Sequence, residues 1–313
     1  MIRPASLLIL GCSVALLLPH RACADDLLKV ATGAPANWEN QPAPLGHQAG
    51  IFKKHGISLE ILATQGSGET MQAAIAASVD VGIGVGTYGA FAAPWSGSQW
   101  RGSALPWQMR ADSPIRSLKD PNGKSIAFSS TGSSTNLIVL ALIKQFGVAA
   151  SPTATGSPAS TYTAVMSGQI DVGWSSPPLG VEALEQGRIR IVARGSDVPS
   201  LQDQTVRVIV ANAGALADKQ DAIHRFMQAY AETVDWMYAD DAALRMYAAS
   251  AKIPFEVAKR ARDEFYPKNN LRPDRLSGVD QAMADAVAMK FLSIRLTKQQ
   301  LDAFFQYQLP ATP

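Results

Sequence analysis

The residues best suited to bind a ligand form a hydroxyl-rich turn near the middle of the chain, at positions 129–134. The apolar run before it, 126–128, predicts a buried strand, and from Asn136 apolar residues recur at helical spacing up to Gly147. A strand that turns into a helix directs backbone N–H groups and hydroxyls at one point, which favours anions and other strong acceptors. The alternative is an ordinary N-cap on a packing helix, because Ser and Thr favour that position. The turn matches neither GxxxxGK[ST] nor GxGxxG, so no nucleotide loop is predicted.

Side chains that could perform catalysis or bind a metal do not form a recognisable set. A nucleophilic hydrolase needs a GxSxG-like elbow and a histidine base, and the three histidines after residue 24 are scattered without metal-ligand spacing: His47, His55 and His224. Acid–base work by paired carboxylates stays open for four residues: Glu69, Asp80, Asp171 and Glu182. Asp80 and Asp171 are expected at strand starts, away from the end where open α/β sheets bind ligands. We therefore expect no enzymatic activity, no metal and no cofactor.

The N-terminus predicts export. Arg3 supplies a positive charge, residues 7–18 are almost wholly apolar, and Ala22-Cys23-Ala24 gives the small-x-small pattern of a cleavage site before Asp25. Residues 1–24 are therefore predicted to be a secretory signal peptide, and the mature protein to be periplasmic. The segment 9–12, Ile-Leu-Gly-Cys, faintly resembles a lipoprotein box, so lipidation remains an alternative.

Composition limits the partners of the mature chain. Both cysteines lie in the predicted signal peptide, so neither a disulfide nor a thiolate site is expected after it. Removing residues 1–24 leaves 26 basic and 26 acidic residues, without a basic run. This balance argues against nucleic acid or an anionic membrane surface as partner.

A short pattern that occurs twice indicates two lobes of similar topology. Residues 73–89 and 164–180 each read as a helix end, then Asp-Val-Gly on a strand, then a turn of small residues and another helix. Each copy follows an earlier strand–polar turn–helix unit, at 66–78 and at 129–147. Strands that alternate with helices favour βαβ units and a parallel sheet, so the predicted fold class is α/β.

Several motifs in order resemble a known family. They are LxxPNGKSIAF at 118–128, TGSST at 131–135, SGQIDVGWSSPP at 167–178, ALEQG at 183–187 and GIFxKxGIxLE at 50–60. Together they resemble the substrate-binding proteins of ABC importers, in the branch that handles sulfonates, taurine, nitrate and thiamine-pyrimidine precursors. This family carries a histidine where the chain has Asn136, so no particular ligand is transferred from it.

The resemblance implies a two-lobed type II periplasmic-binding-protein fold with a mainly parallel sheet in each lobe and a two-strand hinge. Lobe I would comprise residues 25–110 and 206–313, and lobe II residues 111–205. The hinge crossings are expected near 105–109 and 206–211.

The ligand cleft is expected at the turns that follow the strands, where α/β sheets bind ligands. One lobe would offer Asn37, Trp38, Gln41, Gly66, Ser67, Gly68, Thr87 and Tyr88. The other would offer Ser130, Thr131, Gly132, Ser133, Ser134, Thr161, Tyr162, Trp174, Ser175 and Ser176. This set lacks an obvious arginine or lysine clamp, so an anion would depend on helix N-termini and hydroxyls. Stacking of a flat ligand on the aromatic members is the alternative.

The sequence thus predicts a periplasmic solute receptor, a monomer, that closes around a small organic anion such as a sulfonate, nitrate or carboxylate. Its partners would be that ligand, the cognate ABC permease and the ATPase. The alternative is a pyrimidine-precursor binding protein or a related single-use biosynthetic enzyme.

Overall fold

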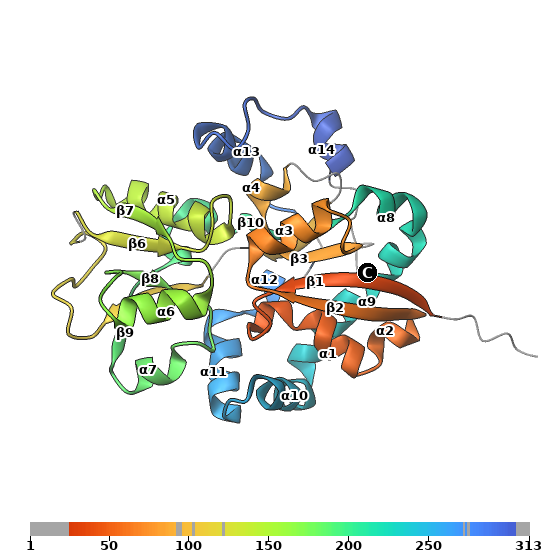
Figure 1. The fold of residues 1–313 in the computed structure, drawn as a ribbon, viewed down its shortest axis with the longest axis horizontal. Helices are drawn as coiled ribbons and strands as arrows, with labels where there is room; N and C mark the ends of the chain where they lie inside the picture. Colours follow the sequence, from red (N-terminus) through yellow and green to blue (C-terminus); the bar gives the residue numbers. More distant parts are fainter. Residues whose placement is uncertain are drawn as a thin grey trace, which may run out of the picture.

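The computed structural model describes residues 25–91, 96–101, 104–120, 123–271, 273 and 276–304. It contains two α/β lobes side by side, each built on its own sheet (Figure 1). The predicted fold class is therefore confirmed. The predicted signal peptide, with Cys12 and Cys23, lies outside the described residues.

Lobe I is built on a five-stranded sheet in the order β2-β1-β3-β10-β4. Its strands are β1 (Asp26–Gly33), β2 (Ile57–Thr64), β3 (Val81–Gly86), β4 (Ser96–Arg101) and β10 (Thr205–Ala211). The first three are parallel, whereas β10 runs antiparallel to both of its neighbours. The helices that cover this sheet include α1 (Pro42–Gln48), α2 (Ile51–Lys54), α3 (Ser67–Ile75), α4 (Thr87–Ala90), α8 (Ala213–Asp218) and α9 (Gln220–Ala239). The short 3-10 helix η1 (Trp38–Asn40) follows β1.

Lobe II repeats this arrangement with shorter strands. They are β5 (Pro106–Arg110), β6 (Ser125–Phe128), β7 (Ser151–Ala154), β8 (Gly173–Trp174) and β9 (Ile189–Arg194). β5 pairs antiparallel with β8 and β9, and β6 pairs parallel with β7. A parallel bridge between Ile126 and Val172 joins the two groups, so the strands follow the order β7-β6-β8-β5-β9. Its helices are α5 (Ser134–Phe146), α6 (Pro158–Met166) and α7 (Val181–Glu185), with 3-10 helices η2 (Gly195–Asp197) and η3 (Pro199–Leu201) after β9.

The two Asp-Val-Gly copies occupy equivalent places in the two lobes. Asp80, before β3, accepts a hydrogen bond from the backbone N–H of Lys29 in β1 at 2.8 Å. Asp171, before β8, accepts one from the N–H of Ser125 in β6 at 3.0 Å. Each carboxylate therefore ties two adjacent parallel strands together, which gives both residues a structural role.

The chain crosses from the first sheet to the second between Arg101 and Pro106, and it returns between β9 and β10. Residues 106–110, which we expected at the hinge and at the end of lobe I, form β5 in the middle of the second sheet. Residues 206–211, expected at the other crossing, lie within β10 of the first sheet. Both crossings thus fall a few residues earlier than expected.

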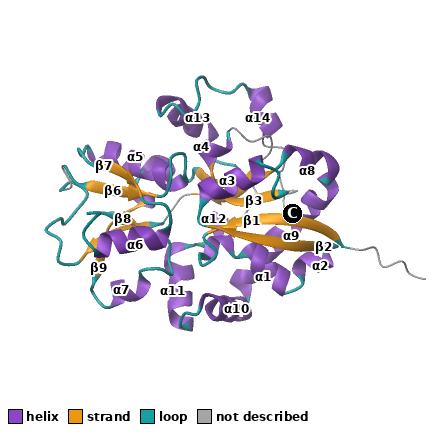
Figure 2. Cartoon of the chain, viewed as in Figure 1, coloured by secondary structure: helices purple, strands orange, loops and turns teal. Residues whose placement is uncertain are grey.

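The C-terminal part of the chain adds helices to lobe I (Figure 2). These are α10 (Asp241–Ala251), α11 (Phe255–Phe265), α12 (Lys268–Leu271), α13 (Val279–Ala288) and α14 (Lys298–Phe304). α11 reaches lobe II through two ion pairs, Arg194–Glu264 at 2.6 Å and Arg260–Glu185 at 3.0 Å. Within the described ranges, none of the helices is both long and apolar enough to cross a membrane.

Candidate functional site

A cavity of about 230 Å³ lies between the lobes. Lobe I lines it with Ala34, Pro35, Ala36, Asn37 and Gln65, and lobe II with Ser157, Pro158, Ala159, Ser176, Pro178 and Leu179. A second cavity of about 340 Å³ shares Ala36, Pro178 and Leu179 and continues past Tyr162 toward α10 and α11. We call the two together the interlobe cleft. Its walls are mostly Ala, Pro and Leu with a few polar groups, a lining that suits an organic ligand.

The local sequence explains how the two walls of the interlobe cleft are formed. On the lobe I side, β1 ends at Gly33 and a turn leads into η1, so residues 34–37 project from the end of the strand. On the lobe II side, Ser157 caps α6 by accepting the N–H of Ser160 at 3.1 Å, and Pro158 occupies the first turn, where its missing N–H costs nothing. The N-terminus of α6 thereby forms part of the cleft wall.

Behind Asn37, lobe I holds a buried ion pair whose arginine also reaches lobe II. Arg207 of β10 donates through Nη1 to Glu39 Oε1 at 2.6 Å and through Nε to Ser134 Oγ at 3.0 Å. Glu39 belongs to η1 of lobe I and is fully buried, whereas Ser134 begins α5 of lobe II. The same Glu39 oxygen accepts from Asn37 Nδ2 at 3.1 Å. Arg207 thus lies behind the cleft wall, paired with Glu39, and is not among the residues that line the cleft.

The sequence around Arg207 indicates that this residue is paired with an opposite charge. It is the one charged residue of the strand Thr-Val-Arg-Val-Ile-Val-Ala, whose seven residues are all buried. A charge in a fully buried strand requires a partner, because transferring an unpaired ion out of water costs several kcal/mol. Glu39 is in a similar position, because it lies between Trp38 and Asn40 in a segment that is also buried. A buried carboxylate likewise requires a partner.

The loops of the two lobes approach each other closely beside this pair. A Cβ placed on Gly86, at the end of β3, would lie 2.7 Å from Gly132 O and from Ser134 N. A Cβ on Gly68 would lie 3.1 Å from Ser130 Oγ. In the described conformation, the hydroxyl-rich turn of lobe II is therefore in contact with lobe I.

The residues predicted for lobe I divide between the cleft and the interior. Asn37 lines the cleft. Trp38 is fully buried, where its Nε1 donates to Tyr238 OH at 2.9 Å, and Gln41 donates to the Asn37 carbonyl at 3.0 Å. Gly66, Ser67 and Gly68 follow the cleft residue Gln65, with Ser67 Oγ accepting from Gly86 N.

Thr87 and Tyr88 lie away from the cleft. Thr87 Oγ1 donates to the Thr205 carbonyl at 2.7 Å. Tyr88 lies 5.7 Å from the ring of Phe291 and donates to Asp285 of α13 at 3.3 Å. Burial raises the pKa of Tyr88 far above its ordinary value, with the Asp285 charge adding to the effect, so this phenol stays neutral.

In lobe II, most of the predicted hydroxyls are used locally. Ser133 caps α5 by accepting from Asn136 N at 3.1 Å, and Thr161 Oγ1 donates to the Ser157 carbonyl at 2.9 Å. Asn136, which replaces the histidine of the family pattern, accepts from Gly132 N within its own turn. Of the loop before α5, Ser130 and Gly132 are partly exposed and Thr131 is exposed.

The remaining predicted residues of lobe II lie on or just behind the cleft wall. Tyr162 and Ser176 line the cleft. Trp174 and Ser175 are buried, and Ser175 Oγ donates to the Leu179 carbonyl at 2.7 Å. Sequence reasoning missed residues 34–36, 158–159 and 178–179, because Ala, Pro and Leu carry no chemical signal of ligand binding, and it also missed the polar Gln65 and Ser157.

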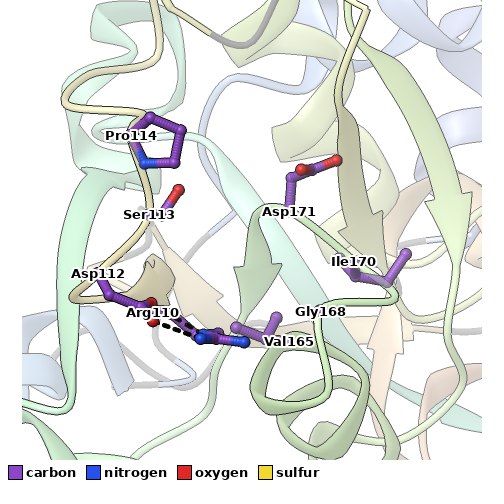
Figure 3. A pocket seen from close by; sticks show the side chains of 8 residues that line it. All are labelled: Arg110, Asp112, Ser113, Pro114, Val165, Gly168, Ile170 and Asp171. Carbon is purple, nitrogen blue, oxygen red and sulfur yellow. Dashed lines mark hydrogen bonds and ion pairs between the residues drawn. The ribbon is translucent and has the colours of Figure 1, made fainter.

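A further cavity, of about 230 Å³, lies on lobe II alone (Figure 3). Arg110 points toward Asp112 there, and its Nε donates to Asp112 Oδ1 at 2.9 Å. The hydrogen bond from Arg110 lowers the pKa of this carboxyl. Arg110 and Asp112 thus pair with each other, Asp171 is held by Ser125, and this cavity lacks the two-lobed lining of the interlobe cleft. Across the described ranges, no three His, Cys, Asp or Glu side chains gather in a way that could hold a metal ion.

The chain resembles known proteins in one family and one fold. Residues 100–243 match the family model described as NMT1/THI5 like. No curated protein gives a significant match. The periplasmic aliphatic sulphonate binding protein SsuA from Escherichia coli is 18% identical, with a TM-score of 0.69 over 92% of this chain and 94% of that chain.

Two further solved structures give the same fold. The alkanesulfonate-binding protein SsuA from Xanthomonas axonopodis pv. citri, bound to MOPS, is 18% identical with a TM-score of 0.69, covering 84% of this chain and 90% of its own. The periplasmic nitrate-binding protein NrtA from Synechocystis PCC 6803 is 14% identical with a TM-score of 0.69, covering 88% and 84%. The predicted resemblance is thereby confirmed: residues 100–243 match the NMT1/THI5-like family model, and the chain has the periplasmic-binding-protein fold.

Proposed function

We propose that this protein is the periplasmic solute-binding component of an ABC importer and captures a small organic anion between its lobes. The observation that carries the proposal is the interlobe cleft, because residues 34–37 form one wall and residues 157–159, Ser176, Pro178 and Leu179 form the other. A ligand in this position would contact both lobes and would stabilise the closed form over an open one. Proteins of the same fold are described as sulfonate- and nitrate-binding, which supports this proposal.

The charge arrangement supports an anionic ligand. The N-termini of α5 and α6 both come from lobe II and end at the interlobe contact, where their free backbone N–H groups favour negative charge. Arg207, whose charge is balanced by Glu39, donates to Ser134 at the start of α5. The Ala, Pro and Leu walls would contact the organic part of the ligand.

The remaining parts of the proposal concern the cell. Residues 1–24 would direct export and be removed, so the mature receptor would work in the periplasm as a monomer. It would deliver its ligand unchanged to a permease that is driven by a separate ATPase.

A second candidate is a pyrimidine-precursor binding protein or a related single-use enzyme. The match of residues 100–243 to the NMT1/THI5-like model favours it. The apolar cleft walls would also suit a flat ring.

A thermal-shift screen of residues 25–313 against sulfonates, nitrate, carboxylates and pyrimidines tests the proposal. We expect one class to raise the melting temperature, because a ligand that binds only the folded form stabilises it. Ala36→Trp should abolish that shift by filling the cleft, whereas Ala76→Trp, on the exposed end of α3, should not. Mass spectrometry should recover the ligand unchanged, and a modified product would favour the enzyme instead.

A further inference from the structure

Two tyrosines from the C-terminal helices hold the walls of the interlobe cleft from behind. Tyr247 of α10 donates from its hydroxyl to the Ala36 carbonyl at 2.7 Å, and Ala36 lines the cleft from lobe I. Tyr266, at the end of α11, donates from its hydroxyl to the Pro177 carbonyl of lobe II at 2.9 Å. Both side chains are fully buried. The first hydrogen bond therefore stays within lobe I, whereas the second joins the two lobes.

Tyr266 is anchored in lobe I. Its carbonyl accepts a hydrogen bond from the Tyr238 hydroxyl, which in turn accepts one from Trp38 Nε1 at 2.9 Å. Its own hydroxyl also has a hydrogen bond with Glu39 of lobe I. Burial raises the pKa of this hydroxyl well above its ordinary value, and the charge of Glu39 adds to the effect. Tyr266 therefore stays protonated and remains a hydrogen-bond donor.

The acceptor of Tyr266 in lobe II belongs to the cleft wall. Pro177 stands between Ser176 and Pro178, which both line the cleft. A solute in contact with Ser176 or Pro178 would hold this segment against lobe I and keep the Pro177 carbonyl within reach of the Tyr266 hydroxyl. When the lobes separate, the carbonyl would move into water and the hydroxyl proton would remain with Glu39.

Resting on the proposed function, we propose that Tyr266 is the positioning residue that holds the lobe II wall of the cleft in its ligand-binding place. Its hydrogen bond to Pro177 exists only while the lobes are together, so it stabilises the closed form over an open one. Tyr247 acts differently, because Ala36 belongs to the same lobe and this bond is kept in both forms. The two tyrosines are thus equally buried and differ in whether their acceptor moves.

The test uses residues 25–313 with Gly68→Cys and Ser130→Cys, because a Cβ on Gly68 would lie 3.7 Å from Ser130 Cβ of the other lobe. The rate at which this cysteine pair cross-links under mild oxidation, without any added solute, reports how often the lobes come together. We expect Tyr266→Phe to lower this rate about fivefold, since one hydrogen bond between neutral groups makes a modest net contribution. Tyr247→Phe, which removes an equally buried hydroxyl, should leave the rate within about twofold, because its bond does not change on closure.

Urea denaturation of the same two variants separates positioning from a general loss of stability. Each variant loses one buried hydroxyl, so we expect Tyr266→Phe and Tyr247→Phe to lower the free energy of unfolding alike. A cross-linking rate that Tyr266→Phe leaves unchanged would overturn the inference. So would a rate that falls as far in Tyr247→Phe as in Tyr266→Phe, because the effect would then belong to any lost hydroxyl.

Calorimetric titration of 1-propanesulfonate, nitrate and 4-methylbenzoate tests the function beneath this inference. A probe that binds the wild-type protein should bind Tyr266→Phe about fivefold more weakly, since closure is part of its affinity. A probe that binds both proteins equally would also overturn the inference and leave the receptor function standing. If neither these probes nor any compound of the wider screen binds, the proposed function fails, and the cross-linking rates still decide the role of Tyr266.

Discussion

Arg207 and Glu39 form an ion pair in a place that water hardly reaches, with exposed side-chain fractions of 8% and 0%. Burying either charge alone would cost several kcal/mol, so each depends on the other and on the hydrogen bonds around them. Those bonds come from Asn37 in the cleft wall and involve Ser134 of the second lobe. At the scale of residues, the pair therefore links the ligand cleft to the contact between lobes.

Replacing Arg207 should show how much the buried charge of Glu39 costs in stability when its cation is removed. We expect Arg207→Met to lower the free energy of unfolding by about 3–5 kcal/mol, because it leaves a buried carboxylate without its cation. Arg110→Met is the matched control: its partner Asp112 is 66% exposed, so the loss should stay below about 1 kcal/mol. Urea denaturation of the two variants measures both values. Equal losses would contradict the view that burial makes the Arg207 pair different.

At the scale of residues, the sequence predicted which residue types gather at the site better than it predicted what each side chain contacts. The turn at 129–134 was predicted as a group of hydroxyls facing a ligand, yet Ser133 caps its own helix and Ser134 accepts from Arg207. Both uses satisfy the same preference of serine for a helix start, so composition does not distinguish them. Arg207 could have been predicted as a paired charge, but its partner is 168 residues away in the sequence.

At the scale of elements, the closed form depends on the fit between the end of β3 and the turn before α5. Gly86 ends β3, and it lets the backbone of lobe II approach to a distance that a side chain would forbid. The same approach brings Ser134 within reach of Arg207. We therefore expect the small residue at this position to set how closely the lobes can approach.

Gly86→Ala should therefore favour an open form without unfolding either lobe. Its Cβ would lie 2.7 Å from Gly132 O and Ser134 N, so the lobes would have to separate. We expect ligand affinity to fall at least tenfold and the radius of gyration of the liganded protein to increase. Gly89→Ala, whose Cβ would meet Gly132 O at an ordinary 3.7 Å, should bind as the wild type does. A normal affinity in Gly86→Ala would show that full closure is not required.

The elements themselves were largely predictable. The alternation of strands and helices and the two Asp-Val-Gly copies indicated two similar α/β lobes, and Asp80 and Asp171 hold equivalent strands. The position of β5 was not predictable in the same way. A short apolar strand fits the hinge or either sheet equally well, and only its long-range pairing with β8 and β9 decides between them.

At the scale of the whole molecule, the two sheets share one design. The order β2-β1-β3-β10-β4 in lobe I corresponds to β7-β6-β8-β5-β9 in lobe II, and in each sheet the antiparallel fourth strand follows a crossing from the other lobe. The two crossings lie beside each other where Gly195 N donates to the Leu105 carbonyl at 3.1 Å, an arrangement that suits rotation of the lobes as rigid bodies. The central claim is that a ligand drives this closure.

A disulfide between the lobes measures closure most directly. A Cβ on Gly68 would lie 3.7 Å from Ser130 Cβ, which fits the ~3.8 Å typical of a disulfide, and cysteine occurs elsewhere only at positions 12 and 23. In the doubly substituted protein, Gly68→Cys with Ser130→Cys, spanning residues 25–313, we predict that the intramolecular bond forms under mild oxidation. A ligand from the thermal-shift screen should accelerate its formation, and a non-binding analogue should not. A ligand that slows the cross-link or leaves its rate unchanged would contradict the account.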